Sequence, residues 1–297
     1  MKPGPGTRLR LATRTSPLAR WQAEHVATLL IAAHPGLAVD VVGTDTLGDR
    51  RVDVPISEIG GKGVFATEVQ RLVLDGAADL AVHSAKDLPA VTGEGLALAA
   101  VPERGDPRDA LVGRPLDALA AGATVATGSQ RRRVQLAALR PDLRFVELRG
   151  NMATRLGKVP DGGAIVVAVA ALERLGLAGR ISEALEVGTV LPQVGQAALA
   201  VETRAGDTEA AALVAAIEHP TTRRRVDAER AFLAELGGDC DLPAGAYAEI
   251  TAAGTVWVRA LLAGDDDEVQ RAEATGADGV ALGAELARRL RAAVGAA

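Results

Sequence analysis

The 297-residue chain is long enough for two or three domains, at about 100 to 150 residues per domain. Its 48 % of hydrophobic residues suffices for buried cores, and aromatics at 2 % mean that alanine, valine and leucine must build them. The net charge of −5 argues against a nucleic-acid binder, which would carry a basic excess. The start lacks the apolar run of a signal peptide, and no segment reaches the length of a membrane span. We therefore expect a cytoplasmic protein with no nucleic-acid and no membrane partner.

The first hundred residues alternate between strand and helix patterns. Residues 9–13 read as a strand, and Ser16 followed by Pro17 is a strong start signal for a helix to about residue 33. A second strand is expected over 37–42, a helix over 64–74 and a buried strand over 79–84. This order predicts an α/β sheet with parallel pairing and crossover connections.

A second α/β round follows residues 103–111, whose glycine, proline and alternating charges resemble a linker. The expected elements are strands over 123–127 and 144–148, with helices over 129–139 and 151–158. The apolar run 164–172 predicts one strand buried on both faces. The segment 191–204 reads as a loop whose end could rejoin the first sheet.

A small α+β domain is expected after Pro220. Its predicted elements are a helix over 224–236, a loop with the only cysteine, strands within 246–262 and a helix over 280–293. The chain is expected to pass twice between the two α/β lobes. Two connecting segments favour a hinged architecture with a ligand cleft between the lobes. We therefore expect a first lobe over 1–102 and 195–218, a second lobe over 103–194 and a C-terminal domain over 219–297.

A single cysteine, Cys240, restricts the chemistry. One thiol excludes an intramolecular disulfide, a cysteine-rich zinc site and a CxxC redox pair. It leaves a packed small hydrophobe, a nucleophile or a covalent attachment point. The loop GGDCDLPAGA (237–246) favours exposure of the thiol. The four histidines form no metal motif, so we expect no metal.

Basic residues gather where helices are expected to begin. A helix N-terminus already attracts anions, so arginine there is unfavourable unless an anion is present. The pattern indicates a polyanionic ligand, with solvated surface cations as the alternative. Steps of 100° allow at most two of three consecutive arginines to share a ligand, so Arg133 is expected to face elsewhere. The residues are Arg14 before Ser16, Lys62 before the helix of Phe65, and Arg131 and Arg132 after Ser129.

The segment HSAKDLP (83–89) closes a strand of the first lobe. Ligands in open α/β sheets bind beyond the carboxyl ends of strands, which places Lys86 and Asp87 where chemistry is expected. Asp87 is suited to general acid/base work or to stabilising a cation. The alternative is an aspartate that caps a turn before Pro89. His83 is interpreted as a packed or hydrogen-bonded histidine.

Nine sequence blocks occur in a characteristic order along nearly the whole chain. The blocks are ATRTSPLARWQAE (12–24), GGKGVFATE (60–68), ADLAVHSAKDLP (78–89), ERGDPRDAL (103–111), RRRVQL (131–136), LRGNMATRL (148–156), AVAALERLGL (168–177), LPQVGQAA (191–198) and the segment 229–248 around the cysteine. In this combination the chain resembles the porphobilinogen deaminase (hydroxymethylbilane synthase) family. Nine blocks in order, with family-like spacing, are far more specific than any one motif.

The resemblance implies a fold and a reaction. Two lobes would be like periplasmic binding proteins, and the third domain would hold a dipyrromethane cofactor on Cys240 through a thioether. The enzyme, a transferase and an expected monomer, would condense four porphobilinogen molecules onto this primer with release of ammonia. Hydrolysis would then free hydroxymethylbilane. Each pyrrole carries an acetate and a propionate, so the growing chain would be the expected polyanion.

The resemblance also implies roles for individual residues. Asp87 would be the catalytic carboxylate, Phe65 and Gln196 would line the cleft, and Lys62 would belong to a loop over the site. Cofactor and substrate carboxylates would be held by Arg14, Ser16, Lys86, Thr127, Ser129, Arg131, Arg132, Arg149, Arg155 and Arg174.

Three positions depart from the family pattern: Glu58, Gly128 and Asp239 stand where lysine, serine and glycine are usual. We expect cofactor loading to survive these changes, at a lower rate. Two other hypotheses stay open. One is a catalytically silent ligand-binding protein of the same fold, and the other is an anion-responsive regulator that uses the third domain for protein contacts.

Overall fold

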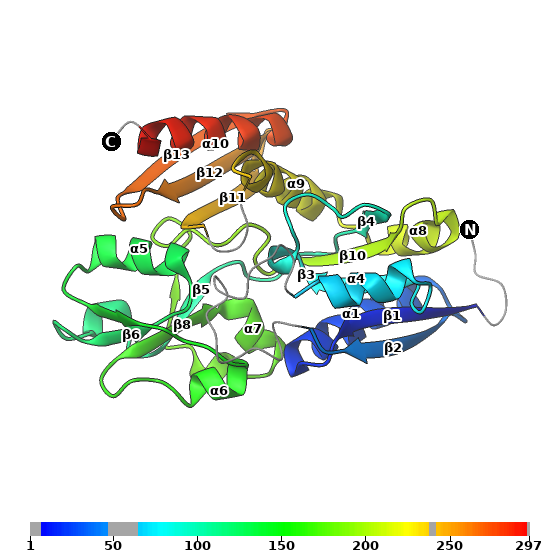
Figure 1. Ribbon diagram of the computed structural model, residues 1–297, viewed down its shortest axis with the longest axis horizontal. Helices are drawn as coiled ribbons and strands as arrows, with labels where there is room; N and C mark the ends of the chain where they lie inside the picture. Colours follow the sequence, from blue (N-terminus) through cyan, green and yellow to red (C-terminus); the bar gives the residue numbers. More distant parts are fainter. Residues whose placement is uncertain (1–6, 47–64, 238–241, 296–297) are drawn as a thin grey trace. The chain divides into compact units, whose positions relative to one another are not determined.

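The computed structural model describes residues 7–46, 65–237 and 242–295. The chain divides into two compact units, each built from two stretches of sequence (Figure 1). The first unit comprises Met1–Arg104 and Ala198–Arg223, and the second comprises Gly105–Ala197 and Arg224–Ala297. Among the described residues, every helix is too short or too polar to cross a membrane.

A five-stranded mixed sheet forms the centre of the first unit, in the order β2-β1-β3-β10-β4. Strand β1 runs parallel to β2 and β3, whereas β10 runs antiparallel to β3 and β4. The returning segment therefore rejoins the first sheet as predicted, but its pairing is antiparallel. The elements are β1 (Arg8–Arg14), α1 (Pro17–Ala33), β2 (Ala38–Thr44), α4 (Thr67–Leu74), β3 (Leu80–Ser84), η1 (Ala85–Asp87), β4 (Leu96–Ala100), β10 (Leu199–Arg204), α8 (Thr208–Val214) and η4 (Ala215–Ile217).

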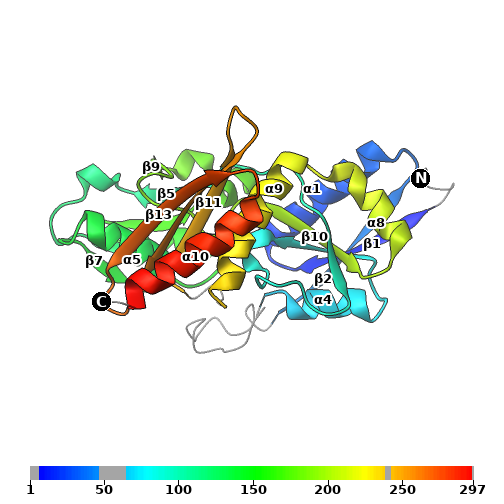
Figure 2. The same ribbon diagram turned by 90° about the horizontal axis from the view of Figure 1, so that it is seen from above.

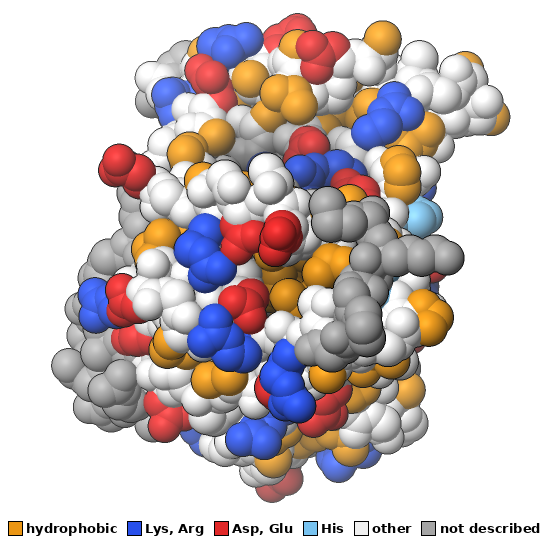
Figure 3. Space-filling model, turned by 90° about the vertical axis from the view of Figure 1, so that its right-hand side faces the viewer, with side chains coloured by type: hydrophobic (Ala, Val, Ile, Leu, Met, Phe, Trp, Pro, Cys, Tyr) orange, Lys and Arg blue, Asp and Glu red, His pale blue; other side chains and the backbone are white. Residues whose placement is uncertain are grey.

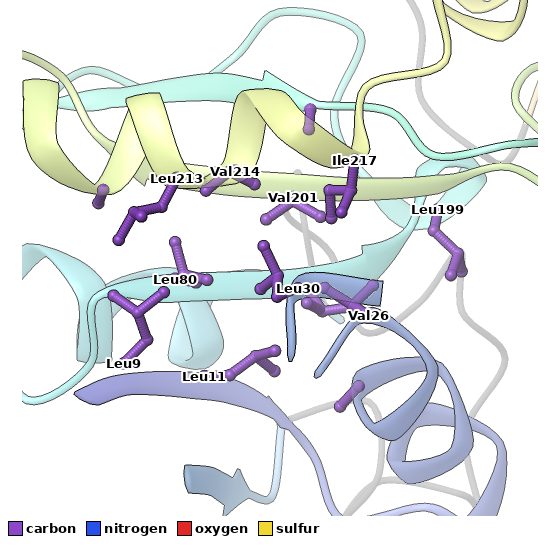
Figure 4. Close-up of a cluster of buried hydrophobic side chains, with 14 of the residues drawn as sticks. Leu9, Leu11, Val26, Leu30, Leu80, Leu199, Val201, Leu213, Val214 and Ile217 are labelled. Atoms are coloured by element: carbon purple, nitrogen blue, oxygen red, sulfur yellow. The ribbon is translucent and has the colours of Figure 1, made fainter. Parts of the chain in front are cut away.

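Helix α1 begins where the sequence predicts. The Ser16 side chain accepts a hydrogen bond from the Ala19 amide, and Pro17 occupies the first helical turn, where no amide proton is needed. The helix buries Val26 and Leu30 in an aliphatic core that also receives side chains from β1, β3, β10 and α8 (Figure 4). Full burial of one such leucine stabilises the fold by about 2 kcal/mol. This core fixes the position of the β1–α1 junction.

Ion pairs are common at the surface of the first unit. Arg8 Nη1 lies 2.6 Å from Asp40 Oδ2, and Arg204 Nη2 lies 2.7 Å from Asp207 Oδ2. The face drawn in Figure 3 likewise shows basic and acidic side chains interspersed. The exposed Arg8–Asp40 pair contributes little to stability, whereas the Arg204–Asp207 pair is partly buried.

The second unit contains another five-stranded sheet, in the order β7-β6-β8-β5-β9. Strand β6 pairs in parallel with β7 and β8, and β5 pairs antiparallel with β8 and β9. The elements are β5 (Asp109–Gly113), η2 (Leu116–Ala118), β6 (Thr124–Ala126), α5 (Gln130–Leu139), β7 (Arg144–Val146), α6 (Met152–Leu156), β8 (Ala164–Ala168), α7 (Val169–Arg174), η3 (Ala178–Arg180) and β9 (Glu183–Leu185).

Two sequence interpretations of this unit are wrong. The segment 103–111 is not entirely a linker, because its last residues begin the interior strand β5. The apolar run 164–172 is not one strand, because β8 ends at Ala168 and helix α7 begins at Val169. Periodicity cannot locate this break, since every residue on both sides of it is buried.

The C-terminal part of the second unit is a three-stranded antiparallel sheet with helices α9 and α10. Figure 2 shows α10 lying along the face formed by β12 and β13. Strand β13 was not predicted from the sequence. The α/β class and the smaller C-terminal α+β domain are confirmed. The elements are α9 (Pro220–Glu235), β11 (Ala244–Ile250), β12 (Val256–Ala263), β13 (Val269–Gly276) and α10 (Gly279–Gly295).

Candidate active site

A pocket lies at the carboxyl end of β3 in the first unit. Strands β1 and β3 are parallel neighbours and end at the same edge of the sheet, which is where ligands bind in such folds. Arg14 is the last residue of β1, and Asp87 lies in the turn η1 that follows β3. The pocket is lined by Arg14, Ser16, Leu18, Ala19, Gln22, Phe65, Val82, His83, Ser84 and Asp87. Four of the predicted site residues therefore meet here: Arg14, Ser16, Phe65 and Asp87.

A cation and a carboxylate face each other in this pocket. Arg14 Nη1 lies 3.8 Å from Asp87 Oδ2, and the Arg14 guanidinium lies over the Phe65 ring at 4.4 Å from the centroid. The side chains are partly exposed, 21 % for Arg14 and 29 % for Asp87. The 3.8 Å separation is too long for a hydrogen bond. Among the described residues, no donor is hydrogen-bonded to the Asp87 carboxylate. Its oxygens can therefore accept from a ligand N–H.

Buried polar contacts lie beneath the pocket. Gln22 Nε2 donates to Ser84 Oγ at 2.8 Å, which joins α1 to the end of β3. His83 Nε2 lies 3.2 Å from Glu202 Oε2, and both side chains are almost fully buried. Gln70 Nε2 donates to the same Glu202 oxygen at 2.8 Å. His83 is thus a packed histidine close to a buried carboxylate, in agreement with its interpretation from the sequence.

A second polar cluster surrounds Asp109 at the start of β5. Arg131 Nη2 lies 2.8 Å from Asp109 Oδ2, and Arg132 Nη2 lies 2.7 Å from Oδ1. Gln196 Nε2 also donates to Oδ1, at 2.9 Å. Burial by itself would raise the pKa of Asp109, but the two guanidinium charges and the hydrogen bonds hold it well below the usual range. The cluster keeps one positive charge, from two guanidinium groups and one carboxylate.

The location of these arginines differs from the simple picture of cations at an exposed helix start. Arg131 is only 2 % exposed, and Arg132 only 7 %. Arg133 instead pairs with Asp267, its Nη2 lying 2.6 Å from Oδ1, as expected for a side chain that faces elsewhere. The prediction that two of the three arginines share a partner while Arg133 faces elsewhere therefore agrees with the structure. The shared partner of Arg131 and Arg132 is Asp109.

The protein-family comparison matches most of the chain. Residues 9–212 match the family model described as "Porphobilinogen deaminase, dipyromethane cofactor binding domain", and residues 223–292 match "Porphobilinogen deaminase, C-terminal domain". The chain belongs to the porphobilinogen deaminase family. The resemblance inferred from the sequence is confirmed, and so is dipyrromethane as the cofactor of the matched domain.

The chain is also similar to solved structures of other proteins, but at low sequence identity. The methionine-binding protein MetQ is 14 % identical, with a TM-score of 0.44 over 70 % of this chain and 88 % of its own. The L-cystine solute receptor of Neisseria gonorrhoeae is also 14 % identical, with a TM-score of 0.39 over 71 % of this chain and 86 % of its own.

The remaining predicted site residues lie at several points of the fold. Lys86 lies beside Asp87 in η1. Thr127 Oγ1 accepts from the Ser129 amide at 3.2 Å, and Ser129 precedes α5 without a side-chain cap bond. Arg155 Nε donates to Gly150 O at 2.8 Å, next to Arg149.

Arg174 ends α7 and donates to the carbonyl of Ala197. Burial lowers its pKa to about 10. Ala197 has the left-handed φ of 68° and follows Gln196, so Arg174 holds the strained backbone next to the Asp109 cluster.

Some predicted positions lie outside the described residues, namely Lys62, Cys240, Glu58 and Asp239. Sequence reasoning missed Asp109 and Glu202. Asp109 was read as a linker charge, although the apolar residues that follow it are a strand signal. Glu202 interrupts an apolar run in β10, and a lone charge there is a signal for a buried partner.

The residues of the matched domain fit a group that carries carboxylates. Arg131 and Arg132 retain one positive charge after pairing with Asp109. Arg131 Nε is buried and has no hydrogen-bond partner in the described structure. An unsatisfied buried donor beside excess positive charge is suited to an anion.

Proposed function

We propose that this chain catalyses the porphobilinogen deaminase reaction. Four porphobilinogen molecules would be condensed in turn onto a dipyrromethane primer attached to Cys240, and hydrolysis would release hydroxymethylbilane. In each condensation the bond to the amino group breaks, ammonia leaves, a carbon–carbon bond forms and one ring proton is lost. We assign the protein as a cytoplasmic monomer. We assign its domains as 1–102 with 195–218, 103–194 and 219–297.

The pocket of Arg14 and Asp87 carries this proposal. Departure of an amino group from a pyrrole methylene leaves positive charge on the ring system. A carboxylate is the group that stabilises such a charge, and its oxygens also accept the pyrrole N–H. The loose contact between Asp87 and Arg14, at 3.8 Å, places a positive charge near the carboxylate while leaving its oxygens accessible.

Arg14 and Ser16 are suited to holding the substrate carboxylates. Arg14 presents a guanidinium already oriented by the Phe65 ring, 4.4 Å from its centroid. Ser16 stands at the N-terminus of the 17-residue helix α1, where backbone amides and the helix dipole favour anions. Lys86 lies next to Asp87 and would add a second cation. These groups would place the substrate so that its pyrrole nitrogen faces Asp87.

Arg131 and Arg132 would hold carboxylates of the cofactor, with Arg149, Arg155, Arg174, Thr127 and Ser129 contributing along the growing chain. The cofactor supplies the nucleophilic pyrrole carbon. The protein binds the acidic side chains and supplies the catalytic carboxylate. Lys62, Phe65 and Gln196 complete the proposed site.

The intact mass of the purified protein tests the attachment. We expect the native chain to exceed its sequence mass by one dipyrromethane and Cys240→Ser to show no excess. Incubation with porphobilinogen should release ammonia from the native protein only. A native protein that stays unmodified after this incubation, or that binds porphobilinogen stoichiometrically without ammonia release, would leave the silent ligand-binding protein as the better description.

Asp87→Asn tests the catalytic carboxylate. The amide keeps the size of the side chain but removes its charge, so we expect substrate binding to persist and turnover to fall by at least about a hundredfold. Asp40→Asn, which breaks the exposed pair with Arg8 in the same unit, serves as the control and should be near normal. Near-normal turnover of Asp87→Asn would show that its assigned role is wrong.

A further inference from the structure

The Asp109 side chain is the centre of a buried network that the proposed mechanism does not yet use. It is fully buried at the start of β5, an interior strand of the second sheet. Its Oδ1 accepts from Arg132 Nε at 3.0 Å and Nη2 at 2.7 Å, and its Oδ2 accepts from Arg131 Nη2 at 2.8 Å. One carboxylate therefore sets the orientation of two guanidinium groups at once.

Backbone carbonyls hold the Nη1 group of each arginine. Arg132 Nη1 donates to Val166 O at 3.0 Å, and Arg131 Nη1 donates to Leu191 O. Gln196 Nε2 donates to Asp109 Oδ1 and, at 2.8 Å, to Pro107 O, so it is a third side chain that holds the carboxylate. Within the described part of the chain, Arg131 Nε has no hydrogen-bond partner. The network thus leaves the Arg131 Nε donor and one net positive charge for a further anion.

Arg131 also reaches the strand that follows the cysteine loop. Its Cδ lies 3.0 Å from the point where a Cβ on Gly245 would stand. Gly245 is the second residue of β11. The Asp109 network and the strand that follows residues 238–241 are therefore neighbours within one compact unit.

We propose that Asp109 is a positioning residue for the cofactor. It would hold Arg131 and Arg132 in the one arrangement in which they donate hydrogen bonds to a cofactor carboxylate, and it would limit their excess charge to one. Without it, two buried cations would repel each other and turn toward other acceptors. This inference rests on the proposed function, because it concerns the same cofactor.

Loading of the full-length chain, produced without a supply of porphobilinogen, tests the inference. Asp109→Asn keeps the shape and removes the charge, whereas Asp109→Glu keeps the charge and displaces the carboxylate. Asp142→Asn is the matched control, since it breaks the Arg140–Asp142 pair just beyond the other end of α5. Intact mass against time, at several porphobilinogen concentrations, gives the loading rate and the half-saturating concentration.

We expect both Asp109 variants, where folded by circular dichroism, to load at least about tenfold more slowly and to need more porphobilinogen. The control should load like the native chain. A merely structural role would lower the melting temperature without changing the half-saturating concentration. Folded Asp109 variants that load at the native rate would overturn the inference. A native chain that gains no mass would instead refute the proposed function.

A chemical rescue decides the case in which neither variant folds. Asp109→Gly leaves a carboxylate-sized space lined by the two arginines and Gln196. Refolding it in sodium formate, with sodium chloride as the control, supplies a separate carboxylate. Recovery of both the folded signal and loading in formate alone supports the positioning role. Failure of formate to restore either of them overturns it.

Discussion

A close approach of two helices in the C-terminal domain gives the sharpest stability prediction. Gly279 and Gly283 stand one turn apart on α10 and face α9. A Cβ on Gly283 would lie 2.2 Å from the carbonyl oxygen of Ala228 and 3.0 Å from the amide nitrogen of Phe232. Both atoms belong to helical backbone, so the contact cannot be relieved by a side-chain rotation. The Gly283→Ala variant must push the helices apart by about 1 Å to reach ordinary van der Waals contact.

The net effect is the difference between two contributions. Overpacking of this kind costs typically about 1–3 kcal/mol, and a backbone contact of 2.2 Å places the cost at the upper end or beyond. Alanine in place of glycine within a helix returns about 1 kcal/mol. We expect a net loss of about 2 kcal/mol in the free energy of unfolding, and a melting temperature lower by about 4–8 °C.

Thermal unfolding followed by circular dichroism measures this loss. Gly295→Ala, at the end of the same helix, is the control, because a Cβ there meets nothing within 4 Å. It should melt at the native temperature or slightly above. The reasoning would be refuted if Gly283→Ala melted as high as Gly295→Ala, since the helix propensity would then outweigh the contact.

Two further predictions concern the two sheets. Gly128→Ser restores the hydroxyl usual in the family. It should lower the free energy of unfolding by about 1–3 kcal/mol, because its Cβ would lie 2.8 Å from Leu148 O. Urea unfolding measures this loss, and an unchanged urea midpoint would contradict the prediction. Although burial opposes it, hydrogen bonds and charge from Arg10 lower the pKa of Asp79 in the folded state. The native chain should thus be more stable than Asp79→Asn by the full amount above about pH 4, the pKa of an aspartate in the unfolded chain. This difference in stability should shrink as the pH falls further. A pH-independent stability gap between the native chain and Asp79→Asn would count against the Arg10 contact.

Local chemistry made part of the fold predictable. Ser16 and Pro17 determine the start of α1 within one residue, because the cap and the missing amide proton act locally. The helical rotation of 100° per residue predicted that Arg133 would point away from Arg131 and Arg132. The motif order also predicted the family and the α/β class. The first two of these signals depend on residues close together in the chain.

Contacts between distant residues decided the rest. Asp109 looks like one charge among several in a linker, and it becomes the centre of a site only when β5 is inserted between β8 and β9. Arg131 and Arg132 are separated from it by 22 and 23 residues, and Gln196 by 87. Similarly, the sequence pattern does not locate the change from strand to helix at Ala168, because the residues on both sides of it are equally buried.

The sequence by itself determined which chemical groups this protein possesses: one thiol, a carboxylate after a buried strand, and arginines at helix starts. The tertiary structure decided which of them meet. Asp87 lies near Arg14 because β1 and β3 are parallel neighbours that end at one edge. Arg131 and Arg132 are buried against Asp109, whose charge offsets part of the free-energy cost of removing two cations from water. Such compensation depends on distance in space, which the order of residues along the chain does not specify.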